Sequence, residues 1–180
     1  MRKLFYSIWS RVWIWWSNIR WKKARKNIPF VSKDKIRKGE SIDEYVKRIS
    51  ALLFSKFIYE HDDLDQLYDT IPPPAEMYAR YLENHFIDDC DGFHSGLSYF
   101  LHNSGIQHRI LLVDSLHNSF AHCVLEYYDG AQWKVCDYDS QMTQEVAIEY
   151  YKDRCNGDFL VYDYEYDYSK NKFQFLSRRR

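Results

Sequence analysis

The chain has 180 residues, enough for one hydrophobic core of ordinary size with short appendages. Only six of these residues are glycine, and none forms a glycine-rich phosphate loop, so the sequence does not indicate a nucleotide-binding fold. The formal net charge is −1, but residues 1–40 hold 12 of the 25 Lys and Arg residues and only two of the 26 Asp and Glu residues. A basic N-terminal segment therefore precedes an acidic body.

Residues 1–27 form a basic, tryptophan-rich arm, with five of the six tryptophans between positions 9 and 21. An apolar stripe at helical spacing predicts an amphipathic helix; its members are Phe5, Ile8, Val12, Trp16 and Ile19. Arg11 interrupts the apolar run, which is too short to span a membrane. No small-residue cleavage site follows, so we expect no secretory signal and a cytoplasmic protein.

The composition of this arm suggests three kinds of surface that it could bind. The helix could lie on an anionic membrane surface, with tryptophan at headgroup depth, which would place the protein peripherally at the membrane. It could equally pack its stripe against the body of the protein or against another protein. Nucleic acid is the weakest of the three, because no recognised binding motif accompanies the basic residues.

A linker over residues 28–40 leads to a body that we expect to be one domain over residues 41–177, followed by a basic tail at 178–180. Ser41 and Glu44 form a capping box, which begins a helix reaching about Tyr59. Further helices are expected near 75–85, 89–103 and 143–154. Strands are expected near 107–113, 119–128, 131–138, 159–166 and 172–177.

Cys90 lies at the start of the helix expected over residues 89–103. Apolar residues three and four positions apart follow it, Asp88 or Asp89 is a suitable N-cap, and Gly105 is a suitable stop. The backbone N–H groups and the dipole at a helix start favour a thiolate over a thiol. The sequence therefore marks Cys90 as a candidate nucleophile.

Downstream, Asp129-Gly130 predicts a two-residue type I′ hairpin turn. Such a turn sets the pairing of the two strands: Tyr128 with Ala131, Val124 with Val135, Cys123 with Cys136, and His122 with Asp137. Directly opposed side chains share one face of a sheet. The turn thus predicts an imidazole beside a carboxylate. In a nucleophilic triad, the imidazole activates the nucleophile and the carboxylate orients the imidazole.

Each of these residues alone has an ordinary structural interpretation. A lone cysteine is usually a small buried apolar residue, which is how we interpret Cys123, Cys136 and Cys155. Cys123 and Cys136 could form a disulfide only in an oxidising compartment. The joint placement of Cys90, His122 and Asp137 favours the catalytic interpretation.

The run from about Leu64 to Tyr138 resembles the transglutaminase-like superfamily, and within it the bacterial transglutaminase-like cysteine peptidases. The resemblance lies in Asp-Cys-Asp-Gly-Phe at 89–93, in His122 opening a strand and in Asp137 on the next strand. It implies an α+β fold with a papain-like, transglutaminase-like core, and a triad of Cys90, His122 and Asp137. The backbone N–H of Cys90 is the expected oxyanion donor, with Asn84 as a candidate for the second.

Asp89 and Asp91 flank Cys90 with negative charge, which opposes thiolate formation. His122 as an imidazolium could outweigh them, they could cap the helix, or a hard cation could bind both. Calcium is the cation that the resemblance implies, although no cofactor is required by the expected chemistry. The spacing is not that of an EF-hand, and helix capping is the simpler interpretation.

We therefore expect a thiol enzyme that hydrolyses a peptide or amide bond in a protein or peptide substrate. Acyl transfer to an amine, as in protein cross-linking, is the alternative within enzymes. A catalytically silent binding or scaffold module of the same fold is the alternative outside them.

Overall fold

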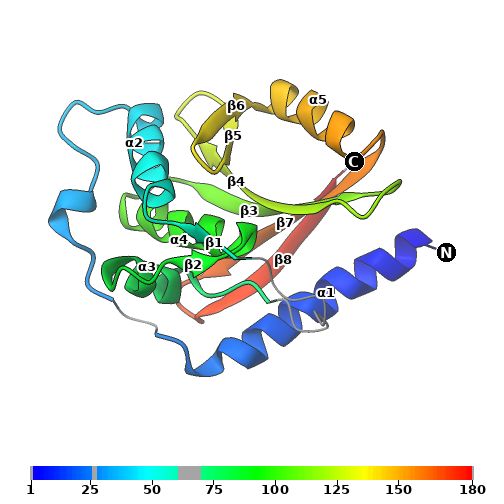
Figure 1. The fold of residues 1–180 in the computed structure, drawn as a ribbon, viewed down its shortest axis with the longest axis horizontal. Helices are drawn as coiled ribbons and strands as arrows, with labels where there is room; N and C mark the ends of the chain where they lie inside the picture. The colour runs from blue at the N-terminus through cyan, green and yellow to red at the C-terminus, as the bar shows by residue number, and fades with distance from the viewer. Residues whose placement is uncertain (1, 26–27, 61–69, 180) are drawn as a thin grey trace.

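The computed structural model describes residues 2–25, 28–60 and 70–179. Its centre is a six-stranded antiparallel sheet in the order β6-β5-β4-β3-β7-β8 (Figure 1). The strands are β3 (His108–Ser115), β4 (Ala121–Tyr128), β5 (Trp133–Asp137), β6 (Ser140–Thr143), β7 (Phe159–Asp167) and β8 (Lys172–Arg179). A two-residue parallel pair, β1 (Ile58–Tyr59) with β2 (Ile87–Asp88), lies apart from it.

Helices cover both faces of this sheet. They are α1 (Arg2–Arg20), α2 (Ile42–Phe54), α3 (Pro74–Leu82), α4 (Cys90–Asn103) and α5 (Gln144–Arg154), with short 3₁₀ turns at Trp21–Lys23 and Ser32–Asp34. Leu125, Tyr127 and Cys136 pack with α2, α3 and α4, whereas Val124 and Val135 pack with α5. Since alternate strand residues face opposite sides, α4 and α5 lie on opposite faces of the sheet. The predicted α+β class, with the Cys90 helix packed on an antiparallel sheet, is confirmed.

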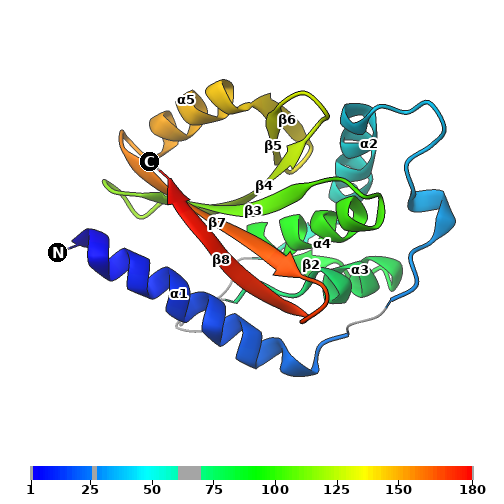
Figure 2. The ribbon, with the colours of Figure 1, turned by 180° about the vertical axis from the view of Figure 1, so that it is seen from behind.

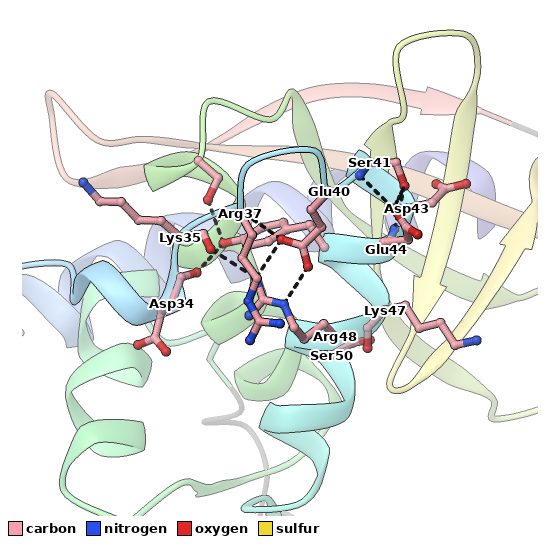
Figure 3. Close-up of polar contacts among 12 residues, drawn as sticks. Asp34, Lys35, Arg37, Glu40, Ser41, Asp43, Glu44, Lys47, Arg48 and Ser50 are labelled. Atoms are coloured by element: carbon pink, nitrogen blue, oxygen red, sulfur yellow. Dashed lines mark hydrogen bonds and ion pairs between the residues drawn. The ribbon is translucent and has the colours of Figure 1, made fainter.

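α2 begins as the sequence predicts, at the capping box between Ser41 and Glu44. The segment before it is docked on the helix by Arg48, whose guanidinium bonds both oxygens of Glu40 at 2.6 and 2.9 Å (Figure 3). The buried Tyr45 hydroxyl donates to the carbonyl oxygens of Asp34 and Phe100. The segment expected as a linker is thus held against the body by α2.

α1 runs along β8 and covers the β7–β8 part of the face that α4 occupies (Figure 2). Ile14 and Ser17 are buried there, and the Trp13 ring meets the Tyr164 ring edge-on at 5.9 Å. The Trp21 indole donates to the hydroxyl of Thr70. Among the described residues, no helix is both long enough and apolar enough to cross a membrane.

The buried face of α1 is not the apolar stripe that the sequence predicts. Val12 and Ile19 of that stripe are exposed, and Trp16 is partly buried. Phe5 and Ile8 lie outside the residues whose side chains the structure describes. The helix therefore has two apolar faces, one on the sheet and one in solvent.

β8 is longer than the predicted strand at 172–177 and includes Arg178 and Arg179. The reason is an ion cluster on the sheet, in which the Arg179 guanidinium contacts the buried carboxylates of Glu126 and Asp163 at 3.1 and 2.9 Å. Arg109 contacts the same two carboxylates. Arg179, which the sequence predicts to lie in a basic tail, is thus part of β8 and pairs with buried carboxylates of the sheet.

Candidate active site

Cys90 is the first residue of α4, as the sequence predicts. Asp89 is the N-cap, and its carboxylate accepts a hydrogen bond from the N–H of Asp91 at 3.0 Å. Gly92 is required because the Asp88 side chain occupies the space that a Cβ atom would take. All four cysteines are free thiols, and Cys90 alone is only partly buried. The sequence therefore builds a helix start that presents one accessible sulfur.

The sulfur of Cys90 accepts a hydrogen bond from the backbone N–H of Cys123, at a distance of 3.3 Å between the nitrogen and Sγ. Cys123 lies on β4 directly after His122. A backbone donor aimed at sulfur favours the thiolate, because it stabilises negative charge there. Nothing in the sequence marks this contact, which depends on how α4 meets β4.

His122 and Asp137 are hydrogen-bonded, with 2.8 Å between Nε2 of the imidazole and Oδ1 of the carboxylate. The second oxygen of Asp137 accepts a bond from the buried hydroxyl of Tyr151 at 3.0 Å. Burial alone would raise the pKa of Asp137, but the bond and charge of His122 and the bond from Tyr151 hold it below its usual value. Because Nε2 faces Asp137, Nδ1 is the nitrogen left to exchange a proton with a substrate or with sulfur.

The pairing that the sequence predicts between β4 and β5 is two residues out of register with the pairing in the structure. β4 and β5 pair Tyr128 with Trp133 and Leu125 with Cys136, not His122 with Asp137 or Val124 with Val135. The cause is the turn: the Asp129 carboxylate accepts bonds from the N–H groups of Ala131 and Gln132, which enlarges the loop to four residues. A slip of two residues leaves every side chain on its predicted face. His122 and Asp137 therefore still meet, diagonally at the ends of their strands.

His94, one turn after Cys90, is fully buried. Its Nδ1 lies 2.6 Å from the carbonyl oxygen of Cys90, and its Nε2 accepts a bond from the backbone N–H of Tyr138 at 3.1 Å. Burial lowers the pKa of His94 to about 4, so the ring is neutral near pH 7. His94 ties the start of α4 to the end of β5, a structural role that we did not predict.

Tyr138 follows Asp137 directly and has φ of 50°, a left-handed conformation that is costly for a bulky residue. Its ring lies 5.9 Å from the ring of His122 and 5.0 Å from that of Phe93. The Tyr138 ring is partly buried and packs against the core. Strain of this kind is often found at functional sites.

Beside the His122–Asp137 pair lies a hollow of about 500 Å³. Arg154 lines one part of it, and six further lining residues are Phe or Tyr: Phe54, Phe57, Tyr59, Phe120, Tyr138 and Tyr150. Asp137 and His122 themselves form part of its wall. A concave, largely apolar surface beside a few polar groups is the usual form of a ligand site.

The carboxylates of Asp88, Asp89 and Asp91 converge beside Cys90, with one oxygen from each lying within 4.8 Å of the others. The sequence predicts Asp89 and Asp91 for a cation but misses Asp88. Burial, with the adjacent charge of Asp89, raises the pKa of Asp88 to about 6, although Arg80 lies 3.2 Å away. Three crowded carboxylate oxygens fit calcium, which takes six to eight oxygen ligands at about 2.3–2.6 Å.

The structure does not support Asn84 as the second oxyanion donor. Its side chain is exposed, and its amide oxygen accepts a bond from the Lys56 ammonium at 3.1 Å. None of the contacts in the described part of the chain links Asn84 to Cys90.

The chain matches no protein-family model and no curated protein. It is similar to solved structures over part of its length. Calcium-bound LapG from Legionella pneumophila is 21% identical over 56% of this chain and 57% of LapG, with a TM-score of 0.45. The EGTA-treated form of LapG is 21% identical over 56% of this chain and 55% of LapG, with a TM-score of 0.44.

A Cytophaga hutchinsonii protein, provisionally described as a cysteine protease, is 14% identical over 54% of this chain and 32% of that protein, with a TM-score of 0.41. This chain thus spans little more than half of LapG and a third of the Cytophaga protein. Because these TM-scores lie below 0.5, we base the function on the site itself.

Proposed function

We propose that the protein is a thiol hydrolase that cleaves a peptide or amide bond in a protein or peptide, with Cys90, His122 and Asp137 as its catalytic residues. The observation that carries this proposal is the convergence at Cys90: its sulfur accepts the N–H of Cys123, and the residue before Cys123 is a histidine bonded to a buried carboxylate. A nucleophile, a base and a group that orients the base are the elements of covalent catalysis.

In the proposed reaction, His122 takes the thiol proton and the Cys90 sulfur attacks the carbonyl carbon of the substrate. Collapse of the tetrahedral intermediate breaks the C–N bond, and the amine leaves with the proton from His122. Water then attacks the resulting thioester and releases the acid and the free thiol. The backbone N–H of Cys90, at the start of α4, would donate to the oxyanion in both steps.

Calcium is proposed as an accessory ion at Asp88, Asp89 and Asp91. Bound there, it would offset the negative charge beside Cys90 and fix the start of α4. It would supply no step of the reaction, since the nucleophile and the base belong to the chain itself.

We also propose that α1 places the protein at an anionic membrane surface on the cytoplasmic side. The exposed face of the helix carries Val12, Trp15 and Ile19, and Trp15 is 62% exposed. Arg11 and Arg20 are exposed on the same helix, and Lys22 and Lys23 follow it. Apolar and aromatic side chains flanked by basic ones favour binding at the headgroup level of an anionic bilayer.

The test of the enzymatic proposal is the reactivity of Cys90. The full chain is treated with iodoacetamide at pH 6, and each modified cysteine is located by mass spectrometry. We expect Cys90 to react at least about tenfold faster than free cysteine, because a thiolate rather than a thiol is the nucleophile. A rate equal to that of free cysteine would favour the silent-module alternative. With a cleavable peptide, added primary amine distinguishes acyl transfer from hydrolysis by the mass of the product.

A further inference from the structure

The aromatic hollow beside His122 has walls that are fixed before any ligand arrives. The Phe57 ring packs on the buried rings of Phe86 and Phe93, with centroid distances of 5.2 and 5.1 Å. Tyr138 is held by its backbone bond to His94, and its ring lies 6.1 Å from that of Phe57. A preformed wall binds a ligand without a large cost in side-chain ordering.

The same hollow gathers large apolar side chains that remain in contact with solvent. Phe54 is 47% exposed, Tyr59 is 49% exposed and Tyr150 is 38% exposed. They come from α2, from β1, which follows α2 directly, and from α5, which is distant from both in the sequence. A contiguous apolar surface built from separate elements marks a binding surface rather than scattered exposure.

The described lining of the hollow holds one carboxylate, which is engaged in hydrogen bonds, and one cationic side chain without an ion-pair partner. Asp137 is its only carboxylate among the described residues, and that group is bonded to His122 and Tyr151. Arg154 is its only Lys or Arg in the same part of the chain, and its guanidinium lies over the Tyr150 ring at 5.0 Å. No described carboxylate forms an ion pair with Arg154. The hollow therefore has an unmatched positive charge beside aromatic rings.

We infer that this hollow is the substrate-recognition site, and that it takes a peptide segment with an aromatic or large aliphatic side chain flanked by Asp or Glu. The apolar side chain packs between Phe57, Tyr138 and Tyr150, and a neighbouring carboxylate pairs with Arg154. The inference rests on the proposed function, because His122 and Asp137, two of the three proposed catalytic residues, line the hollow. Arg154 is thus a specificity residue, separate from the catalytic groups.

The test measures binding without chemistry. The full chain with Cys90→Ala, labelled with ¹⁵N, is titrated with peptides of Gly and Ser that carry Glu-Phe-Glu, Lys-Phe-Lys or Glu-Ala-Glu at their centre. We expect Glu-Phe-Glu to bind at least about tenfold more tightly than either of the others, with amide shifts at Phe120, Tyr138 and Tyr150. Equal affinities for the three peptides, or no shifts at these residues, would overturn the inference.

Charge reversal at one position gives the sharper result. In the same background, Arg154→Glu should reverse the preference, so that Lys-Phe-Lys binds more tightly than Glu-Phe-Glu, and Arg154→Gln should abolish it. Lys152→Glu makes the same charge change two residues earlier on α5, outside the hollow, and should keep the original preference. The amide spectrum of each variant shows directly that it is folded.

These outcomes separate the two proposals. If Cys90 is unreactive to iodoacetamide but the Cys90→Ala protein prefers Glu-Phe-Glu, the enzymatic proposal fails and the recognition site stands. If Cys90 is reactive but Arg154→Glu does not change the peptide preference, the recognition site is wrong and the enzymatic proposal stands.

Discussion

The Nδ1 atom of His94 lies 2.6 Å from the carbonyl oxygen of Cys90, so a second histidine holds the main chain beneath the candidate nucleophile. This ring is neutral and buried, and its other nitrogen fixes Tyr138 at the end of β5. One buried side chain therefore joins the main chain of the candidate nucleophile to the residue that follows Asp137.

This bridge predicts a pH-dependent effect of His94→Phe on stability. Folding lowers the pKa of His94 to about 4 from a usual 6.5, so its neutral form contributes full stability above pH 6.5 and that contribution is lost as the pH falls toward 4. The substitution leaves the Tyr138 N–H without its acceptor and should cost about 1–3 kcal/mol at pH 7. The cost should shrink between pH 6.5 and 4, as measured by urea unfolding at several pH values.

The control for this prediction is His85→Phe, because His85 is exposed. Its effect should be small and should not vary across the same range. A His94→Phe penalty that stays constant from pH 7 to pH 4 would mean that folding does not lower the pKa of His94.

Asp137→Asn should leave the protein folded but slow its chemistry. An amide in place of the carboxylate no longer holds His122 in one tautomer, and by the precedent of serine proteases peptide hydrolysis should fall by about 10²–10⁴-fold. Alkylation of Cys90 at pH 6 should slow as well. Asp139→Asn, an exposed change two residues away, is the matched control. Unchanged hydrolysis in Asp137→Asn would remove this residue from the mechanism.

Calcium should raise the melting temperature of the full chain if the three carboxylates hold it. A ligand at 100 times its dissociation constant stabilises by about 2.7 kcal/mol, which corresponds to roughly 5–10 °C for a chain of this size. Calorimetry with 1 mM calcium against EGTA measures the shift. Asp91→Asn should abolish it, and Asp153→Asn on the surface of α5 should not. Identical curves in calcium and EGTA would leave helix capping by Asp89 as the role of the cluster.

Substitutions on the two faces of α1 should have different effects, one on membrane binding and the other on stability. Trp15→Ser combined with Ile19→Ser should weaken binding to anionic vesicles in a flotation assay without changing the unfolding free energy, because both side chains face solvent. Ile14→Ser should destabilise the protein by about 2–4 kcal/mol, because Ile14 is buried against the sheet. Wild-type binding should also weaken with salt, since exposed charges are screened. Vesicle binding that is equal in all variants would exclude a membrane role for this face.

The sequence predicts the helix that carries Cys90 well, because N-cap, apolar spacing and glycine stop all act locally. It predicts the faces of His122 and Asp137 but not their register, since the Asp129 side chain changes the loop by an even number of residues. β6 is missed because its four residues, one exposed and three partly buried, are mostly polar and lack a strand pattern. The contact from Cys123 to the sulfur and the bridge made by His94 depend on distant elements meeting, which no local pattern encodes.

The amide side chain of Asn18 on α1 bonds both the carbonyl oxygen and the N–H of Phe173 on β8, at 3.0 and 2.9 Å. It therefore occupies, at one point, the place of a neighbouring strand along the open edge of the sheet, where unpaired backbone groups invite pairing with other chains. The two partners lie 155 residues apart. During synthesis, α1 is made long before β8. Until β8 has been made, the face of α1 that packs on the sheet is exposed and is available to a chaperone or a bilayer.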